Sequence, residues 1–320
     1  MSNVAVLAGG LSLEREVSLM TGRRVAQALS GLGHEVTTLD LDDDLVPRLT
    51  GGQFDAAFLA LHGETGEDGT IQGLLELLQI PYTGPGPTAS ALAWDKVTAK
   101  GLVARAGVKT PSWIAMSVNA IRDMGAAKAM DQVVARLGLP LVVKPAQGGA
   151  SLGVKIVHDA SELSAALVAS LSYHSVVAIE QYIDGTEVAI SIVNGDALPV
   201  VEIVPKTGVY DYSARYTHGA TEFYAPARLP GEIAERCQSA ALDAYTALGC
   251  RNVTRADLIV DDGGQPWFLE LDTSPGMTET SLLPMAAQAA GWTFDDLCAR
   301  LLNAAIGNAS HTTSAAPTPR

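Results

Sequence analysis

Cysteine is scarce in this sequence, with three residues among 320, and none of them forms a Cys-x-x-Cys pair. An odd number of cysteines without metal-ligand spacing excludes a disulfide scaffold and a cysteine-type zinc site. Cys237, Cys250 and Cys298 each lie in an alanine-rich, helix-like stretch. We interpret all three as ordinary packing or surface residues.

Basic residues are also few, since 21 Lys and Arg stand against 35 Asp and Glu and give a formal net charge of −14. Nucleic-acid binding needs a basic face, so the composition predicts no nucleic-acid partner. It does not argue against a nucleotide ligand, because a few well-placed Lys or Arg residues can hold a triphosphate inside an acidic protein.

Long hydrophobic runs are missing as well. No stretch approaches the roughly 18 apolar residues that a membrane span needs. No basic segment precedes the first apolar run, Val4 to Ala8, as it would in a secretory signal. We therefore expect no membrane partner and a cytoplasmic location.

What the sequence does contain indicates a globular protein of several domains. Hydrophobic residues make up 48% and charged residues 18% of the chain, as in folded globular proteins. With 320 residues and a mass of 33.3 kDa, the chain is about twice as long as a domain of roughly 150 residues. Breaks in the pattern predict an N-terminal α/β domain, a central domain, a C-terminal domain and a disordered tail, at 1–87, 88–180, 181–307 and 308–320.

The first third of the chain alternates between strands and helices, with apolar strands predicted at 4–8, 34–39 and 55–61. This alternation predicts a parallel, doubly wound sheet, in which ligands bind at the carboxyl ends of the strands. Gly9-Gly10 and His62-Gly63 both fall at such ends.

The pattern changes after the Gly-Pro-Gly-Pro stretch that ends at Pro87. A single helix at 92–106 is predicted first. Strands at 141–144, 154–157 and 176–180 follow, and then hairpins, one of them with Asn194-Gly195 as its turn. The last helix is predicted to end near Ala305.

A second hairpin carries the most informative residues. A turn centred on Gly263-Gly264 pairs Asp257 with Glu270 and Arg255 with Asp272, and the period of two places all four on one face. Ala256, Leu258, Leu269 and Leu271 then form the core face. Three carboxylates cannot be neutralised by one Arg, so the set predicts a divalent-cation site, completed by phosphate oxygens. The structural alternative is a salt-bridged surface patch.

Weaker signals surround this hairpin. Lys144 precedes a Gly-rich loop that suits a phosphate, although no Walker A pattern is present. Glu180 and Glu187 flank a predicted interdomain strand that could present backbone groups to a base and carboxylates to a ribose. A polar, aromatic loop at 210–216 is of the kind that closes over a site. Taken alone, the Lys144 loop is equally well explained as an ordinary turn, Glu180 and Glu187 are better explained as exposed strand-end acids, and Lys96 as a helix surface residue.

Together the motifs resemble the D-alanine–D-alanine ligase family of the ATP-grasp superfamily, from Val4 to about Ala305. The motifs are the stretches that contain Gly9-Gly10 with Glu14 to Ser18, His62 to Gly69, Asp95-Lys96, Lys144-Pro145, Glu270 to Thr278, and Ser281 to Ala286. The resemblance implies an ATP-grasp fold, in which the central domain is a lid. It also implies the substrates ATP and D-alanine, two Mg²⁺ ions with Mn²⁺ as a substitute, a role in peptidoglycan precursor synthesis, and a homodimer.

The resemblance also implies a role for each matching residue. The residues that would bind ATP are Lys96, Lys144, Glu180, Tyr182, Ile183, Glu187 and Arg215. The residues that would bind the metal ions are Asp257, Glu270 and Asp272. The residues that would bind the D-alanine substrates are Glu14, His62, Ser281 and Leu282. The residues implied to be catalytic are Glu14, Arg255, Tyr216 and Gly276. The implied reaction proceeds through an acyl phosphate, with the Gly-rich loop and loop 205–225 closing together to exclude water.

Three positions depart from the family pattern. Residue 272 is Asp where Asn is common, residue 215 is Arg where Lys is usual, and residue 150 is Ala where a Ser usually links the Glu14 side to Tyr216. These departures leave open a ligase for another amino-acid or hydroxy-acid pair. A nucleotide-binding regulator would not need Arg255, and an NAD-dependent dehydrogenase would need a GxGxxG motif after the first strand.

Overall fold

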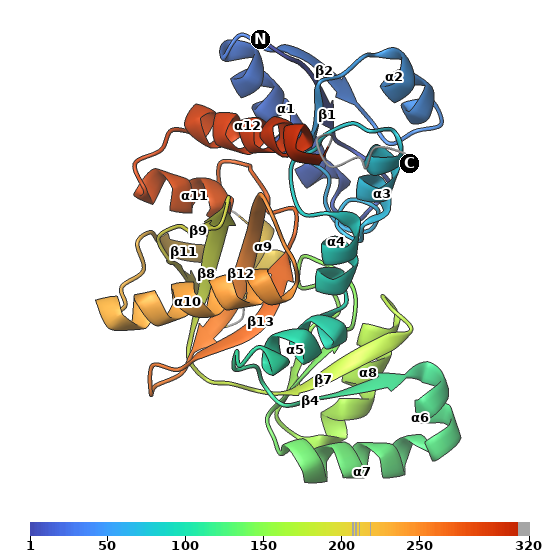
Figure 1. The fold of residues 1–320 in the computed structure, drawn as a ribbon. Coiled ribbons are helices and arrows are strands. Elements are labelled where there is room, and N and C mark those ends of the chain that lie inside the picture. Colours follow the sequence, from blue (N-terminus) through green and yellow to red (C-terminus); the bar gives the residue numbers. More distant parts are fainter. Residues whose placement is uncertain (207, 209, 211, 218, 313–320) are drawn as a thin grey trace, which may run out of the picture.

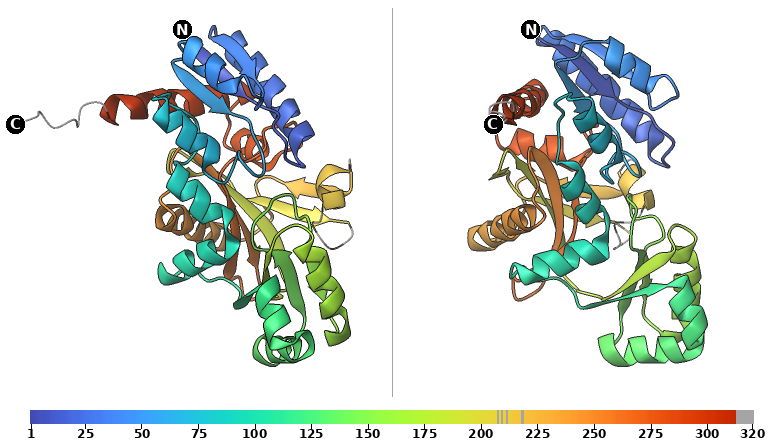
Figure 2. Two further views of the ribbon diagram at one scale, coloured as in Figure 1. Left: turned by 90° about the vertical axis from the view of Figure 1, so that its right-hand side faces the viewer. Right: turned by 45° about the vertical axis from the view of Figure 1, so that its right-hand side comes forward.

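The computed structural model describes residues 1–312 except 207, 209, 211 and 218. Three sheets follow one another along the chain. Figures 1 and 2 show the N-terminal sheet at one end of the molecule, the central sheet at the other, and the C-terminal sheet between them. The described helices include none long and apolar enough to cross a bilayer.

The N-terminal sheet is parallel, with the strand order β2-β1-β3. Its strands are β1 (Asn3–Leu7), β2 (Glu35–Leu39) and β3 (Ala56–Leu59), and its helices are α1 (Arg15–Gly31), α2 (Leu45–Gly51) and α3 (Thr70–Leu77). The run from Val4 to Leu7 is buried throughout, as expected for a parallel strand covered on both faces. The predicted doubly wound arrangement of this part is confirmed.

The central sheet is antiparallel, with the order β4-β7-β5-β6. Its strands are β4 (Trp113–Ser117), β5 (Leu141–Pro145), β6 (Lys155–Val157) and β7 (Val176–Gln181). Its helices are α6 (Val118–Met124), α7 (Ala126–Leu137) and α8 (Leu163–Leu171), with a 3-10 turn at Ala160–Glu162. An apolar cluster that includes Leu141, Val143, Leu163 and Ile179 fills the space between sheet and helices.

The C-terminal sheet has the order β11-β10-β8-β12-β13, and β9 pairs with β8. Its strands are β8 (Thr186–Val193), β9 (Asp196–Ala197), β10 (Val201–Pro205), β11 (Thr221–Tyr224), β12 (Val253–Val260) and β13 (Pro266–Asp272). The helices around it are α9 (Tyr212–Tyr216), α10 (Gly231–Ala247), α11 (Leu282–Ala289) and α12 (Phe294–Thr312). Asn194 and Gly195 both have positive φ, as the predicted tight turn between β8 and β9 requires.

The predicted helix at 92–106 is two helices, α4 (Pro87–Trp94) and α5 (Lys96–Arg105). The helical conformation is interrupted at Asp95, which has an extended backbone and is the N-cap residue of α5. Its side chain accepts a hydrogen bond from the Thr98 N–H at 2.8 Å. Ala93, Ala99 and Val103 pack into the core beneath the C-terminal sheet. The domain boundaries at 87, 180 and 307 stay a prediction.

The last helix also differs from expectation. It runs to Thr312, past Ala305 where the sequence predicts its end, and residues 313–320 of the predicted tail lie outside the described part of the chain.

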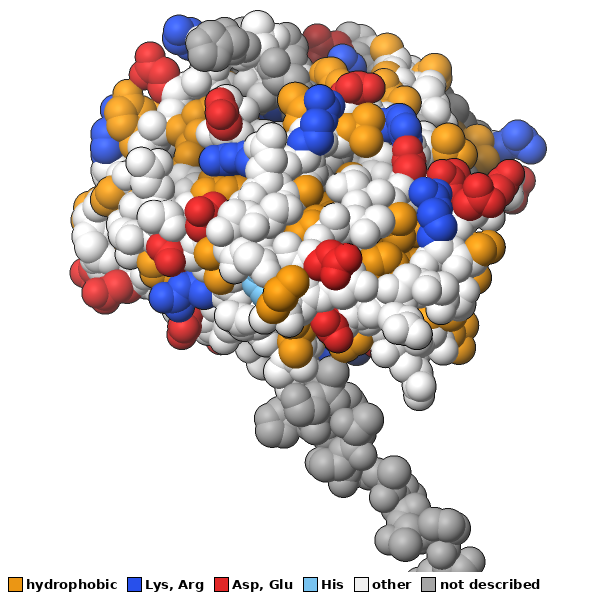
Figure 3. Space-filling view, turned by 90° about the horizontal axis from the view of Figure 1, so that it is seen from above, with side chains coloured by type: hydrophobic (Ala, Val, Ile, Leu, Met, Phe, Trp, Pro, Cys, Tyr) orange, Lys and Arg blue, Asp and Glu red, His pale blue; other side chains and the backbone are white. Residues whose placement is uncertain are grey.

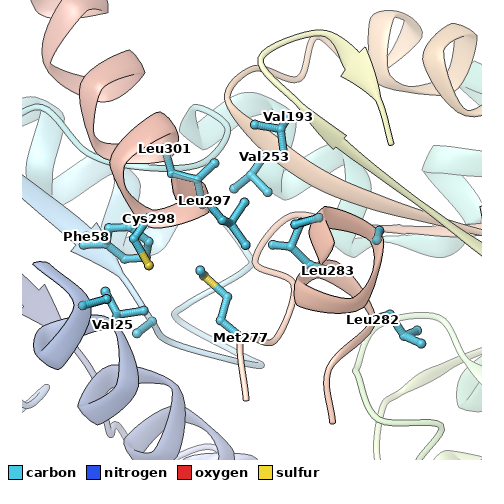
Figure 4. Packing of buried hydrophobic residues seen from close by; sticks show 14 of the residues in the cluster. Val25, Phe58, Val193, Val253, Met277, Leu282, Leu283, Leu297, Cys298 and Leu301 are labelled. Atoms are coloured by element: carbon cyan, nitrogen blue, oxygen red, sulfur yellow. The ribbon is translucent and has the colours of Figure 1, made fainter. Parts of the chain in front are cut away.

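The N-terminal and C-terminal sheets share one apolar core, shown in Figure 4. Val25 of α1 and Phe58 of β3 meet Met277, Leu283 of α11, and Leu297 and Leu301 of α12. Burying this surface fixes the carboxyl ends of β1 and β3 against the segment that follows β13. The glycine-containing loops at Gly9-Gly10 and His62-Gly63 are therefore held beside the segment that follows β13.

Candidate active site

Two pockets meet over the edge of the C-terminal sheet. Pocket A, of about 400 Å³, lies between the central and C-terminal sheets. Pocket B, of about 450 Å³, lies between the N-terminal loops and the C-terminal sheet. The residues that line both are Lys96, Gly148, Gly149, Tyr210, Arg215 and Glu270. The space is thus one bipartite site with a junction.

The β12–β13 hairpin places its charged face at this junction. Arg255 pairs with Asp272 and Asp257 with Glu270, as predicted. The guanidinium of Arg255 contacts both oxygens of Asp257 at 2.7 and 2.8 Å and Asp272 at 2.9 Å. Burial works against its charge, but these two carboxylates keep the pKa of Arg255 well above its ordinary value. Arg255 therefore stays a cation at the floor of the site.

The turn of this hairpin is not the one predicted. The strands end at Val260 and Pro266, so the loop has five residues, and a bulge after Asp257 shifts the register between the turn and the site. The bulge turns Leu269 into pocket A, whereas the sequence predicts it in the core. Phe268, fully buried, occupies the core instead.

The carboxylates suit a metal ion that arrives with a phosphate. Asp257 is 2% exposed, and Glu270 Oε2 lies 3.2 Å from the Lys96 Nζ. Burial raises the pKa of Glu270, but the charges of Lys96 and Lys144 outweigh it and lower the pKa to about 2. Among the described residues no three His, Cys, Asp or Glu side chains converge into a metal cage. Mg²⁺ is commonly held by one or two carboxylates together with substrate phosphates. The side chains of Asp257 and Glu270 can provide these carboxylate oxygens.

One helix carries two lysines near pocket A, of which Lys96 lines the pocket and Lys100 contacts Glu180 of the pocket lining. Lys96, at the start of α5, donates to the Gly148 carbonyl of the Gly-rich loop. Lys100, one turn later and fully buried, lies 3.2 Å from Glu180, whose other oxygen lies 2.9 Å from Lys144. Sequence reasoning missed Lys100, although its i+4 spacing from Lys96 was a usable signal.

The charges of this group depend on one another. Burial lowers the pKa of Lys100 to about 8, even though the Glu180 charge opposes that shift. Burial would raise the pKa of Glu180, but the two lysines hold it below its ordinary value. Glu180 is therefore an anion that pairs with Lys144 of the pocket lining and with the buried Lys100.

The remaining predicted ATP residues also line pocket A. Tyr182 and Ile183 follow β7 and border the pocket with Glu187 at the start of β8. Burial raises the pKa of Glu187 to about 7. The carboxyl of Glu187 is thus poised to change its charge near neutral pH.

Glu14 reaches pocket B directly before α1. A Cβ on Gly149 would lie 2.4 Å from the Glu14 Oε1, and one on Gly63 would lie 3.5 Å from it. Glu14 thus lies so close to the Gly-rich loop that a side chain at position 149 would displace its carboxylate. This contact joins the N-terminal domain to the central one across the pocket.

Both ring nitrogens of His62 lie within hydrogen-bond distance of protein atoms. Its Nδ1 lies 3.0 Å from the Ser274 carbonyl and its Nε2 lies 3.2 Å from the Thr21 hydroxyl. Burial lowers the pKa of His62, so we assign a neutral ring with the proton on Nδ1, because a carbonyl can only accept. His62 lines pocket B and ties the segment after β13 to the N-terminal domain.

Glu67 was not given a role by the sequence, although it lies within the quoted motif. Its Oε1 accepts from the Gly63 N–H at 2.9 Å and lies 3.8 Å from the His62 Nδ1. Burial, helped by the charges of Asp272 and Glu14, raises the pKa of Glu67 well above its ordinary value. Pocket B therefore contains one buried carboxyl that is protonated more readily than a carboxyl in water.

The far wall of pocket B is the start of α11. Ser281 is its N-cap residue, and its Oγ accepts from the Thr278 N–H at 3.0 Å. A Cβ on Gly276 would lie 2.9 Å from that Oγ. The exposed N–H groups of a helix start attract an anion, and Leu282 supplies the first of them.

Arg215 and Tyr216 lie on α9. Arg215 lines both pockets, with its guanidinium over the Tyr210 ring at 4.2 Å. The Tyr216 side chain lies outside the described residues, so its predicted role stays a prediction. The structure thus gathers the predicted ATP residues in pocket A, the substrate residues in pocket B, and Glu270 and Arg215 at the junction.

Three sheets that enclose adjoining pockets, with cations and carboxylates between them, are the architecture of the ATP-grasp enzymes. Residues 102–303 match the family described as D-ala D-ala ligase C-terminus, and residues 45–85 match D-ala D-ala ligase N-terminus. The chain belongs to the D-alanine–D-alanine ligase family.

Individual relatives extend over nearly the whole chain. A D-alanine–D-alanine ligase of Syntrophotalea carbinolica is 46% identical over 93% of this chain and 94% of its own. The crystal structure of D-alanine–D-alanine ligase from Bacillus anthracis is 37% identical, with a TM-score of 0.85 over 98% of this chain and 100% of its own. The VanG D-Ala:D-Ser ligase from Enterococcus faecalis is 28% identical, with a TM-score of 0.81 over 95% and 99%.

Proposed function

We propose that the protein joins two D-alanine molecules into D-alanyl-D-alanine, with cleavage of ATP to ADP and phosphate, for peptidoglycan precursor synthesis. The observation that carries this proposal is the shared wall of the two pockets, where Lys96, Arg215 and Glu270 border both. A nucleotide in pocket A presents its terminal phosphate to an amino acid in pocket B only at that wall.

The first step forms an acyl phosphate. A carboxylate oxygen of the first D-alanine attacks the γ-phosphorus, the bond to the β-phosphate breaks, and ADP leaves. Glu14 holds the ammonium group of this D-alanine, while Lys96, Lys144 and Arg215 offset the charge of the transferring phosphoryl group. Asp257, Glu270 and Asp272 would hold Mg²⁺, which supplies Lewis-acid stabilisation of phosphate charge.

The second step forms the peptide bond. The second D-alanine is held by its carboxylate at Ser281 and the Leu282 N–H. Its ammonium group loses one proton to solvent, and the resulting amine attacks the acyl carbon. The second proton leaves the nitrogen as the amide forms and is taken up by the departing phosphate. Arg255 and the Gly276 N–H stabilise the tetrahedral oxyanion. Inorganic phosphate then leaves with the carboxylate oxygen that attacked in the first step. Tyr216 is assigned to this site by resemblance alone.

The second substrate has one specific alternative. The similar VanG enzyme is named a D-Ala:D-Ser ligase, and the departures at Ala150 and Asp272 lie on the pocket B side of the junction. The test is phosphate release with D-alanine alone and with D-alanine paired with D-serine or D-lactate, with product masses determined. We expect D-alanyl-D-alanine to be the main product, and a mixed product in its place would establish the alternative.

Two properties of the working protein complete the proposal. We infer a cytoplasmic location, since the reaction consumes ATP and the described helices include no membrane span. Figure 3 shows basic and acidic side chains interspersed over one face of the molecule. The homodimer implied by the resemblance is tested by light scattering of the purified protein.

A further inference from the structure

The Gly-rich loop and α9 are joined by a serine hydroxyl. Ser151 Oγ donates to the Tyr210 carbonyl at 3.0 Å and accepts from the Arg215 Nε at 3.0 Å. It thereby connects a residue of the central domain to two residues of the C-terminal domain, about 60 positions away along the chain.

The other contacts of this segment hold α9 to its own domain. Tyr210 is 9% exposed and meets Phe223 of β11 edge-on at 6.2 Å. The Thr221 hydroxyl donates to the Ala214 carbonyl at 2.7 Å. These contacts fix one side of α9, while the Arg215 side chain extends from it to the junction of the pockets.

The residue at position 215 suits this arrangement because it is Arg. A guanidinium has N–H donors on three nitrogens, so its Nε can bond to Ser151 while its terminal nitrogens serve another acceptor. The single nitrogen of a lysine cannot divide its donors over the same distance. The neighbouring Ala150 has no hydroxyl, and both Ala150 and Ser151 have left-handed backbones with φ of 52° and 55°. The Ser151 hydroxyl is the one that reaches Arg215 of α9.

We propose that Ser151 is a positioning residue, whose hydroxyl holds the Arg215 guanidinium at the junction of the two pockets. In this chain Ser151, rather than residue 150, supplies the serine hydroxyl that connects the Gly-rich loop to α9, and its partner there is Arg215. The kinetic part of this proposal rests on the proposed function, and the structural part does not.

The test removes the hydroxyl in two backgrounds. Ser151→Ala and the near-isosteric Ser151→Cys are each made in the wild-type chain and in Arg215→Lys. Ser172→Ala is the matched control, since Ser172 is an exposed serine at the C-cap of α8 whose hydroxyl donates to the Val168 carbonyl at 3.0 Å. Hydrogen exchange of peptides covering α9 in the ligand-free protein and steady-state kcat and KM for ATP are measured for every variant.

In the wild-type background we expect both Ser151 variants to exchange about tenfold faster at α9 and to lose about tenfold in kcat, the weight of one hydrogen bond to a charged group. In the Arg215→Lys background the same changes have less than a twofold effect on kcat and a smaller effect on exchange, because only the hydrogen bond to the Tyr210 carbonyl is then lost. Equal losses in both backgrounds, a Ser151→Cys variant that behaves as wild type, or unchanged exchange would overturn the proposal. If the wild type makes no dipeptide, the proposed function fails, and the exchange comparison still decides the contact.

Discussion

The two walls of pocket B are held in different ways. The wall that carries His62 and Ser281 rests on the apolar core shared by the N-terminal and C-terminal sheets. The wall formed by the Gly-rich loop and α9 is joined by the polar contacts of Ser151. Apolar burial holds the first wall in place whatever charges are nearby, whereas the polar contacts of the second wall change when the charged phosphates of a nucleotide bind. We therefore expect the wall of His62 and Ser281 to fix the position of the substrates, and the wall of the Gly-rich loop and α9 to respond to nucleotide binding.

The largest effect should come from the charged floor that both walls share. Asp257→Asn should lower turnover at least about 100-fold, the range found when preorganised electrostatic groups are removed, because the carboxylate is needed for Mg²⁺. Steady-state phosphate release measures the loss, and circular dichroism checks that the fold is kept. Near-full turnover in this variant would show that the hairpin face is not the metal face.

The next largest effect should follow from weakening the apolar wall. Leu301 of α12 is fully buried in the shared core, so Leu301→Ala should lower the free energy of unfolding by about 2–5 kcal/mol. Urea unfolding measures it, with Leu77→Ala as the exposed control in α3. Wild-type stability in Leu301→Ala would mean that this core does not hold the wall in place.

A smaller effect concerns Glu187 and pH. Its pKa of about 7 means that the carboxylate, the better acceptor for ribose hydroxyls, forms as pH rises through 7. ATP affinity should therefore increase between pH 6 and 7.5, and Glu187→Gln should flatten this dependence. Isothermal titration calorimetry at several pH values measures both, and an unchanged slope in the variant would contradict the assignment.

The same residue makes a prediction about stability. The unfolded carboxyl ionises near its ordinary pKa of 4.5, and the folded one only near 7. Stability is thus lost as pH rises between these values. The Tm of Glu187→Gln relative to wild type should be higher at pH 8 than at pH 5.

The smallest effect is expected at Asp272. Asp272→Asn removes the charge that faces Arg255, but the amide oxygen can still accept from the Ser274 N–H, now 2.9 Å from Asp272 Oδ1. One weakened hydrogen bond predicts less than about a tenfold change in turnover. A larger loss would show that the additional carboxylate is essential in this chain.

The sequence predicts local pairings better than contacts between domains. The alternation of strands around Gly9 and His62 and the opposition of Asp257 and Glu270 follow from periodicity and turn chemistry, and both are confirmed. The hairpin register was correct at the site only because the longer loop and the bulge compensate each other.

Contacts between elements far apart in the chain were missed. Lys100 meets Glu180, 80 residues away, and Ser151 meets Arg215. Such pairs depend on how the sheets pack against one another, which no periodicity within either segment encodes. Asp95, which lies inside the helix predicted at 92–106, ends one helix and caps the next because its side chain competes for backbone N–H groups.

The central claim is that a carboxylate in pocket B is phosphorylated at the junction by a nucleotide in pocket A. The direct test supplies D-alanine with both carboxyl oxygens as ¹⁸O, together with ATP and Mg²⁺, and determines the isotope content of the phosphate by mass spectrometry. Because the attacking oxygen leaves with the phosphate, one ¹⁸O should appear in phosphate for each dipeptide formed. Dipeptide formed with unlabelled phosphate would contradict the account.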